Sequence, residues 1–279
     1  MHNEYMLVDC GEGAQMQLSR YDLPLMRINH IFISHLHGDH YLGLPGLLFT
    51  LHLHHRQNDL HLYSPRGLNE ILTTQFFYSR SVPSFRIIIH TLNTETRQLI
   101  LDHPHFTVES VPLHHKLPCC GFIFKEKPKS LRIDPQKVPS TLPPHYYKAL
   151  KNGEDVVDEA GKVLYKNEDY TLPPHRSYSY AYCSDTIYSQ ELVQQLQGTD
   201  VIYHEATFTS ADAGKARETR HSTAADAATV ARQAGATKLL LGHFSARYRE
   251  LHTLLQEARA VFPNTELAEE GRTFYLTRL

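Results

Sequence analysis

The chain has 279 residues, of which 41% are hydrophobic and 21% are charged, and its formal net charge is −2. This composition is typical of a soluble globular protein with one large domain or two small ones, and no apolar run reaches the length that spans a membrane. Because the net charge is close to zero, the sequence excludes bulk electrostatic attraction to nucleic acid and leaves such binding to a local patch.

Short apolar runs that predict strands recur along the chain, and each is followed by a residue that can bind a metal ion. A single aspartate after a strand often only closes a turn. Several such cases in one chain are difficult to explain by stability alone, and together they predict one shared site. The runs, each with the residues that follow it, are Met6–Val8 with Asp9, Ile31–Ile33 with His35, Val108–Leu113 with His114 and His115, Tyr180–Cys183 with Asp185, Val201–Tyr203 with His204 and Glu205, and Leu239–Leu241 with His243.

The second of these runs leads into the most informative motif, in which His35, His37, Asp39 and His40 follow the pattern HxHxDH. In an extended segment, side chains two residues apart point to the same side, and Gly38 permits a sharp turn before the next pair. Zinc binds both imidazole and carboxylate ligands. The motif therefore predicts two adjacent metal ions, an arrangement that suits in-line attack on a phosphodiester.

The next segments predict regular structure. Residues Tyr41 to His55 are apolar enough for a helix, with Pro45 near its start. The run Leu51–His55 within it also contains HxH, but we interpret this run as a helix surface that binds no metal. From Ile87 to Val111, apolar and polar residues alternate without an intervening helix, which predicts antiparallel strands.

Two helices are predicted in the last third of the chain. The first covers about Ala224 to Gly235, and either Ser222 or Thr223 can cap its N-terminus. The second covers about Tyr248 to Val261 and is ended by Pro263.

The segment from residue 126 to residue 177 has a different composition. It is rich in proline, lysine and tyrosine and poor in patterns of buried strands. Two interpretations remain open from composition: an ordinary surface insertion, or an extended arm that reaches a large substrate.

The pattern of cysteines helps to predict the cellular compartment of the protein. None of Cys10, Cys119, Cys120 and Cys183 forms a CxxC pair, so neither a zinc knuckle nor a disulfide framework is predicted. The N-terminus lacks the basic and apolar plan of a signal peptide. We expect reduced thiols in a cytoplasmic protein.

Several blocks together resemble the tRNase Z endoribonucleases of the metallo-β-lactamase superfamily, from Val8 to Tyr248. The HxHxDH motif alone marks only the superfamily, which includes lactamases, glyoxalases and phosphodiesterases, whereas the later blocks are more specific. The matching blocks are Val8–Gly13, Ser34–His40 with Leu42–Leu48, His115 with Gly121 and Phe122, Ser184–Thr186, His204–Phe208, His221–Thr223, and Gly242–Ser245 with Arg247 and Tyr248.

The resemblance implies an α/β fold, the αββα sandwich, with two Zn²⁺ ions at one edge and Mn²⁺ as a metal that can substitute. It favours His115 as a ligand, with His114 as the alternative, and implies that Asp9 orients the ligands. One ion would be bound by His35, His37 and His115, the other by Asp39, His40 and His243, and Asp185 would bridge them.

The implied activity is removal of the 3′ trailer from precursor tRNA. Asp39 would accept the proton of the attacking water. His221, oriented by Glu205, would protonate the leaving 3′ oxygen; the alternative for His221 is a plain neighbour of a helix cap. Arg247 would hold a phosphate oxygen, or form only a surface ion pair.

The resemblance also implies that residues 126–177 form a flexible arm whose basic tip, with Lys148 and Lys151, contacts the substrate. In a homodimer, the arm of one subunit would grip the tRNA that the other subunit cleaves.

Family members have a longer segment before the Val8 block, so we expect this chain to lack their N-terminal hairpin. Two alternatives follow. The chain could be another phosphodiesterase or esterase of this fold that acts on small substrates, or an inactive truncated homologue. The arm discriminates against the first, because small substrates need none, and metal content tests the second.

Overall fold

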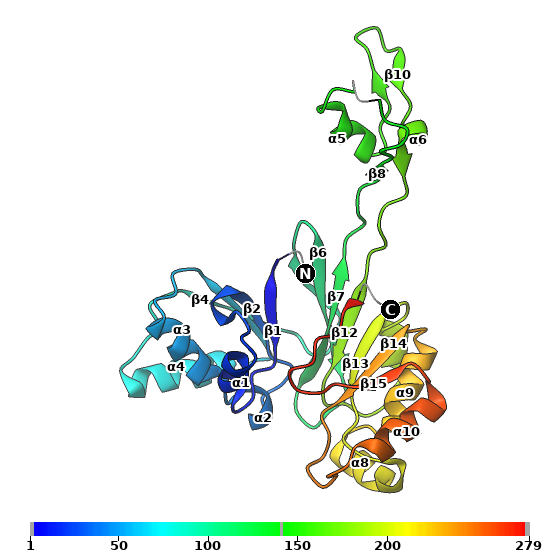
Figure 1. Ribbon diagram of the computed structural model, residues 1–279. Coiled ribbons are helices and arrows are strands. Elements are labelled where there is room, and N and C mark those ends of the chain that lie inside the picture. Colours follow the sequence, from blue (N-terminus) through cyan, green and yellow to red (C-terminus); the bar gives the residue numbers. More distant parts are fainter. Residues whose placement is uncertain (1–2, 140–141, 277–279) are drawn as a thin grey trace. The chain divides into compact units, whose positions relative to one another are not determined.

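The computed structural model describes residues 3–139 and 142–276. The chain divides into two compact units, one made of residues 1–125 with 179–279 and the other of residues 126–178, which we call the inserted unit. Figure 1 shows both units, and each is described by itself below.

A four-stranded parallel sheet forms the first half of the larger unit, with the order β1-β2-β3-β4. Successive residues of a strand face opposite sides of the sheet. Ile31 and Leu62 therefore pack under the helices on the outer face, whereas Phe32 and Tyr63 point toward the second sheet. The elements of this half are β1 (Tyr5–Val8), α1 (Ala14–Arg20), η1 (Leu25–Arg27), β2 (Ile28–Phe32), α2 (Gly38–Tyr41), α3 (Leu44–Leu53), β3 (Leu60–Ser64), α4 (Leu68–Ser79) and β4 (Ile87–Thr91).

A seven-stranded mixed sheet forms the second half, with the order β15-β14-β13-β12-β7-β6-β5. Strands β12 to β15 are parallel, and β12 pairs antiparallel with β7. Helix α9 lies close to this sheet because small side chains such as Ala227 and Ala231 form its buried face. The elements are β5 (Gln98–Asp102), β6 (Phe106–Leu113), β7 (Cys119–Glu126), β12 (Ser179–Cys183), α7 (Gln190–Gln195), β13 (Val201–Glu205), η2 (Ser210–Asp212), α8 (Ala213–Thr219), α9 (Ala224–Gln233), β14 (Lys238–Gly242), α10 (His252–Val261) and β15 (Thr265–Leu267).

Aromatic side chains fill the space between the two sheets. Phe32 stacks on Tyr63 with 4.6 Å between ring centroids and meets Phe124 edge-on at 5.5 Å. Phe106 and Phe122 are fully buried beside them. Offset and edge-on ring pairs of this kind stabilise a core beyond the apolar area that they bury. The layers are therefore helices, sheet, sheet and helices, and the expected αββα sandwich is confirmed.

The inserted unit is small and has its own core, in which Leu142, Leu150 and Val156 are buried. Two short antiparallel strand pairs, β8 with β11 and β9 with β10, form its sheets. Its elements are β8 (Arg132–Ile133), α5 (Tyr146–Lys151), β9 (Val156–Val157), β10 (Val163–Tyr165), α6 (Asn167–Tyr170) and β11 (Thr171–Leu172).

The strands predicted from apolar runs are present as β1, β2, β6, β12, β13 and β14, and the predicted helix at Ala224 is α9. Of the two possible caps of α9, Thr223 is the one used. Its hydroxyl accepts a hydrogen bond from the Asp226 backbone N–H at 3.1 Å, and the Asp226 carboxylate accepts one from the Thr223 backbone. Among the described residues, no helix is long and apolar enough to cross a membrane.

Two predictions in the first half of the chain were wrong in detail. Strand β4 is parallel to β3 and belongs to the first sheet, because Ile87 and Ile89 pack against that sheet's outer helices; only β5 and β6 form the expected antiparallel pair. The helix predicted from Tyr41 begins at Leu44 instead. Its break has a local cause, since the Gly43 backbone N–H bonds to the Cys10 carbonyl at 2.9 Å.

One further prediction requires correction. Helix α10 begins at His252, four residues later than Tyr248, whose hydroxyl accepts a hydrogen bond from the Thr209 backbone N–H and thereby holds this segment against another loop. The stretch Lys148 to Lys151, expected at the basic tip of the arm, lies in helix α5, with Leu150 buried in the core of the inserted unit.

A row of histidines crosses the first sheet on the side that faces the aromatic core. His30 and His61 are register partners on β2 and β3 with ring centroids 5.1 Å apart, and His61 Nδ1 lies 3.0 Å from His90 Nε2 on β4. Burial and the neighbouring His61 lower the pKa of His30 to about 4, although Glu4 opposes this shift. Since an unfolded histidine titrates near pH 6.5, the native protein keeps His30 neutral where the unfolded chain would bind a proton.

We therefore expect stability to fall with acid in a defined window. The contribution of His30 is present above about pH 6.5 and is lost as the pH falls toward 4, because the unfolded state then binds the proton more readily. The variant His30→Phe, whose ring can extend the stack, should show a shallower decline. The measurement is the denaturant midpoint of metal-free protein between pH 4 and 7. Parallel curves for parent and variant would show that His30 does not contribute to this decline.

Candidate metal centre

Four side chains from three separate segments form the first half of a polar cluster at one edge of the sandwich. His35 and His37 follow β2, His115 follows β6 and Asp185 follows β12. His37 Nδ1 lies 3.0 Å from His35 Nε2 and 3.2 Å from His115 Nε2. Asp185 Oδ2 lies 3.5 Å from His35 Nε2 and 3.7 Å from His115 Nε2. All four potential ligand atoms thus converge within 4.8 Å of one another.

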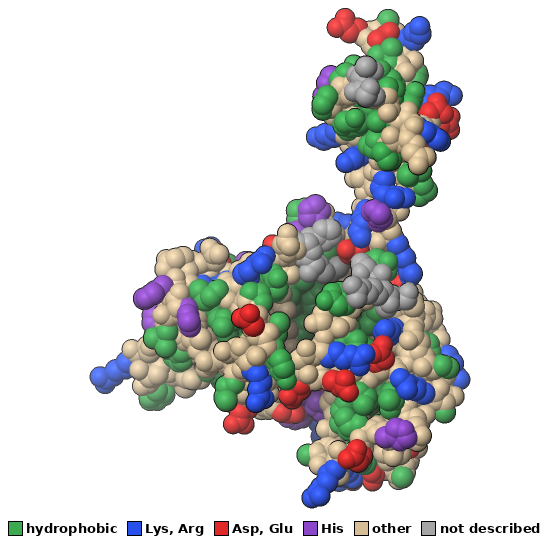
Figure 2. All heavy atoms as spheres, viewed as in Figure 1, with side chains coloured by type: hydrophobic (Ala, Val, Ile, Leu, Met, Phe, Trp, Pro, Cys, Tyr) green, Lys and Arg blue, Asp and Glu red, His purple; other side chains and the backbone are tan. Residues whose placement is uncertain are grey.

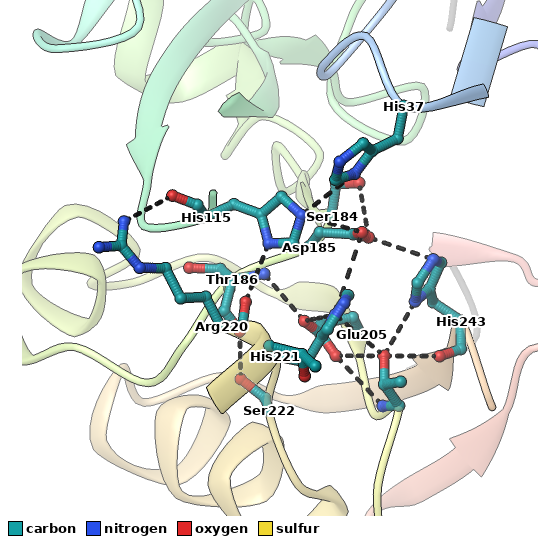
Figure 3. A network of polar contacts seen from close by, with 12 residues as sticks. His37, His115, Ser184, Asp185, Thr186, Glu205, Arg220, His221, Ser222 and His243 are labelled. Carbon is teal, nitrogen blue, oxygen red and sulfur yellow. Dashed lines mark hydrogen bonds and ion pairs between the residues drawn. The ribbon is translucent and has the colours of Figure 1, made fainter. Parts of the chain in front are cut away.

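Asp39, His40 and His243 form the second half of the cluster. Asp39 Oδ2 lies 3.4 Å from His40 Nε2 and 3.5 Å from His243 Nε2. The other oxygen of Asp185, Oδ1, lies 3.4 Å from His40 Nε2 and 3.2 Å from His243 Nε2. Asp185 therefore presents one carboxylate oxygen to each half of the cluster, as a bridging ligand must. Figure 3 shows His37, His115 and His243 converging on it.

The spacing of these atoms fits metal ligands. With metal–nitrogen bonds of about 2.0–2.1 Å, two ligands of a tetrahedral zinc site lie about 3.3 Å apart. His40 gives independent support. Its Nδ1 faces the Asp9 carboxylate at 2.8 Å, and a carboxylate can only accept, so this nitrogen carries the proton. Its Nε2 is buried without a hydrogen-bond partner and faces the cluster, so in the neutral ring that a metal ion requires its lone pair would point at the ion.

In the metal-free cluster, the imidazoles lie so close together that they cannot all carry a positive charge. Burial and then the neighbouring His40, His115 and His37 lower the pKa of His35 to about 2. His40 behaves oppositely. Burial disfavours its charged form, but the neighbouring carboxylates of Asp39, Asp9 and Asp185 prevail and raise its pKa to about 10. One imidazole thus holds a proton that a metal ion would have to displace.

A second layer of polar groups holds the cluster from behind. The buried carboxylate of Glu205 accepts hydrogen bonds from the Thr186 backbone at 2.8 Å, from His221 Nδ1 at 2.9 Å and from the Thr207 hydroxyl at 2.6 Å. Burial disfavours its charge, but the hydrogen bond from His221 and that ring's charge outweigh burial and lower the pKa of Glu205. The Thr207 oxygen also lies 2.9 Å from His243 Nδ1. One buried carboxylate therefore orients His221 directly (Figure 3) and, through the hydroxyl of Thr207, also His243.

Backbone packing brings the loop after β1 against the motif loop. A Cβ on Gly11 would lie 2.1 Å from the Asp39 carbonyl oxygen, and one on Gly43 would lie 1.9 Å from the Gly11 carbonyl oxygen. Only residues without a side chain can occupy these two positions. Asp9, at the end of β1, is thereby held beside His40.

Three residues of the site have left-handed backbone conformations. Asp9 has φ 55°, Arg220 has φ 58° and His243 has φ 56°. Such values are uncommon for residues other than glycine. At His243 this turn directly follows β14 and aims the imidazole back over the strand ends.

The structure also places the remaining candidates. His114 is outside the cluster: its side chain is 45% exposed and its Nε2 lies 3.4 Å from the Glu191 carboxylate. Arg247 forms an ion pair with Asp212 at 3.3 Å, and its guanidinium lies over the ring of Phe208.

Lys148 and Lys151 lie on α5 of the inserted unit. His204, which follows β13 in the predicted strand-end series, is buried, its Nδ1 lies 2.7 Å from the Glu205 carbonyl oxygen, and it takes no part in the cluster.

Sequence reasoning missed two residues that contact the site. The Arg220 carbonyl accepts a hydrogen bond from His115 Nδ1 at 3.0 Å, and its guanidinium donates to the His115 carbonyl at 2.9 Å, so the pair forms a reciprocal clamp. Thr207 was quoted only as part of a block. The sequence signal that could have identified Thr207 was its position two residues after Glu205. The role of Arg220 depends partly on its backbone carbonyl, and a backbone atom leaves no signal in the sequence.

The fold and the cluster define the class: a metallo-β-lactamase fold with a histidine and aspartate cluster suited to metal ions. A solved structure titled human tRNase Z, short form, superposes with a TM-score of 0.69 at 27% identity, covering 99% of this chain and 90% of that one. The metallo-beta-lactamase fold protein YhfI from Bacillus subtilis has a TM-score of 0.65 at 19% identity, covering 98% of this chain and 87% of that one, and shows the fold alone. A family model described as anti-Pycsar protein Apyc1 matches residues 1–126.

Curated relatives then give the family. A protein named ribonuclease Z from Bacteroides fragilis is 45% identical over 272 residues, covering 97% of this chain and 89% of the relative. Another, from Cytophaga hutchinsonii, is 46% identical over 277 residues, covering 99% of this chain and 88% of the relative. The chain belongs to the ribonuclease Z family.

Proposed function

We propose that this chain is a zinc-dependent endoribonuclease that removes the 3′ trailer from precursor tRNA in the cytoplasm. The convergence of seven potential ligands, with Asp185 presenting one oxygen to each half of the cluster, is the observation that carries the proposal, because a bridged pair of metals suits phosphodiester cleavage. The names of the relatives, ribonuclease Z and tRNase Z, support the substrate class.

Two Zn²⁺ ions, with Mn²⁺ as a substitute, would occupy the two halves of the cluster. Bound zinc supplies an activated water nucleophile and stabilises charge on the phosphate. The first ion would be held by three imidazoles and the second by two imidazoles and a carboxylate. The first ion would bind His35, His37 and His115, the second would bind Asp39, His40 and His243, and Asp185 would bind both.

Two residues would move the protons. The neighbouring imidazoles of His243 and His40 lower the pKa of Asp39 and keep it a carboxylate, the form in which it would accept the proton of the attacking water. His221 would donate to the leaving 3′ oxygen. Because its Nδ1 faces Glu205, its Nε2 is the nitrogen left to reach the substrate. Arg247, although paired with Asp212, would contact a phosphate oxygen when the substrate competes for its guanidinium.

The inserted unit would bind the tRNA away from the scissile bond. On the face seen in Figure 2, the basic side chains of this unit are interspersed with acidic ones, so local contacts and not bulk charge would position the RNA. Lys148 and Lys151 in α5 are the proposed phosphate contacts, and none of the unit's described residues belongs to the metal cluster. We further propose a homodimer in which the inserted unit of one subunit binds the tRNA that its partner cleaves.

The metal centre predicts a matched pair of outcomes. Asp185→Ala should lose most bound metal, because it removes the shared ligand, while the parent retains about two equivalents per chain, as a two-metal centre requires. His115→Ala should lose the first ion selectively. The measurement is metal content of dialysed protein by atomic emission. His114→Ala, one residue away and exposed, is the control and should keep both ions. Full metal content in Asp185→Ala would refute the bridge.

His221 separates proton transfer from metal binding. His221→Ala should keep its zinc, yet cleave precursor tRNA roughly 10²–10⁴-fold more slowly, which is the usual loss for a missing general acid. A phosphodiester with a nitrophenolate leaving group needs no protonation and should be cleaved nearly as fast as by the parent. Equal losses on the two substrates would indicate that His221 shapes the site and donates no proton.

The inserted unit predicts a separation of substrates. Replacing residues 130–174 by a short Gly-Ser linker should leave hydrolysis of a small chromogenic phosphodiester and the metal content unchanged. Binding of precursor tRNA should weaken at least tenfold, about 1.4 kcal/mol, and lose part of its salt dependence. The double variant Lys148→Ala/Lys151→Ala should lose a part of the same affinity. A linker variant that binds and cuts precursor tRNA like the parent would instead favour a hydrolase of small substrates.

A further inference from the structure

The carboxylate of Asp9 is the meeting point of four hydrogen bonds. Oδ1 accepts from the Ser34 backbone N–H at 2.7 Å. Oδ2 accepts from the Ser34 hydroxyl at 2.9 Å, from His40 Nδ1 at 2.8 Å and from the Tyr182 hydroxyl at 2.9 Å. Ser34 and His40 belong to the first sheet and its motif loop, as Asp9 does, whereas Tyr182 lies on β12 of the second sheet. Among these donors, only Tyr182 reaches Asp9 from across the sandwich.

The ring of Tyr182 is itself firmly placed. It stacks on Tyr203 of the neighbouring strand β13, with 4.7 Å between centroids and 9° between planes. The hydroxyl of Tyr203 lies where a Cβ on Gly242 would be, at 2.1 Å, so the ring fills the space beside this glycine. Gly242 immediately precedes the ligand candidate His243. The two tyrosines thus form a continuous row behind the second half of the cluster, from Asp9 to the end of β14.

The hydrogen bond from Tyr182 to Asp9 bears on how His40 can bind a metal ion. A metal ligand of this kind needs its outer nitrogen protonated and held, so that the inner one offers its lone pair. Asp9 Oδ2 holds the outer nitrogen, and its direction is fixed by the donors that surround it. Burial and then the nearby charge of Asp9 raise the pKa of the Tyr182 hydroxyl, which therefore remains a donor. Without it, Asp9 keeps only the donors of Ser34 and His40 and loses its hydrogen bond to the second sheet.

We propose that Tyr182 is a positioning residue of the metal centre, whose hydroxyl fixes Asp9 and thereby holds His40 as a ligand of the second metal ion. The role rests on the proposed two-metal centre. Because Tyr182 lies three residues before Asp185, one strand sets both the bridging carboxylate and the support of a ligand on the opposite sheet. Asp9 is thus fixed relative to β12 and not only relative to its own loop.

The test uses Tyr182→Phe, which removes one oxygen and keeps the ring. Tyr180→Phe is the matched control, because Tyr180 lies two residues earlier on the same face of β12 and carries no hydrogen bond to Asp9 among the described contacts. Zinc affinity is measured by competition with a chromophoric chelator. We expect one of two ions to bind about 10–100-fold more weakly in Tyr182→Phe, the usual effect of losing an outer hydrogen bond. The other ion should bind as in the parent and in Tyr180→Phe.

Two backgrounds assign the affected ion. In His115→Ala, which keeps the ligands of the second ion, adding Tyr182→Phe should weaken the remaining zinc. In His243→Ala, which keeps those of the first, it should not. Equal weakening in both backgrounds, or unchanged affinity for both ions in Tyr182→Phe, would overturn the positioning role. A parent protein that binds no zinc would instead refute the proposed metal centre itself, so the two failures are distinguishable.

Discussion

The site depends on the burial of one carboxylate. Asp185 is only 2% exposed, and burying an unpaired negative charge would be unfavourable by several kcal/mol. Its charge is offset by His40 and His243, whose pKa values are raised and whose Nε2 atoms lie 3.4 Å and 3.2 Å from Asp185 Oδ1. Those imidazoles come from both sheets, so the charge can be matched only when the sandwich has closed. Strand β12, which carries Asp185, pairs with β7 on one side and β13 on the other, and this central place leaves the carboxylate little freedom to move.

Two further carboxylates orient imidazole rings of the site. Asp9 after β1 and Glu205 at the end of β13 each accept several hydrogen bonds and each face an imidazole. Their partners differ in kind. His40 is one of the proposed metal ligands, whereas His221, although it also lies near Asp185, faces Glu205 with Nδ1 and has its other nitrogen left for the substrate. The same device, a buried acceptor behind a histidine, can therefore serve metal binding at one place and proton transfer at the other.

The strands, and the residues that gather at their ends, could be predicted from the sequence because both depend on short local patterns. Apolar runs followed by Asp9, His35, Asp185 and His243 mark strand ends, and parallel strands bring such ends to one edge. Strand partners are not determined locally: the run Ile87 to Thr91 predicts a strand that fits either sheet, and only its packing against the outer helices selects the first. Tyr182 looked like an ordinary strand aromatic, since its hydroxyl partner lies 173 positions away along the chain.

The left-handed turns at Asp9, Arg220 and His243 carry a consequence for evolution and engineering. Each such residue costs about 1–2 kcal/mol of conformational energy relative to an ordinary backbone, and glycine would relieve most of it. Glycine at these three positions would also delete an acceptor, a clamp or a potential ligand. Selection for thermal stability alone would therefore favour substitutions that remove side chains from the site. Selection for catalytic activity must instead keep the left-handed backbone at these residues, which the rest of the sandwich holds in place. Stability gains in this scaffold are best sought far from the ends of β1 and β14.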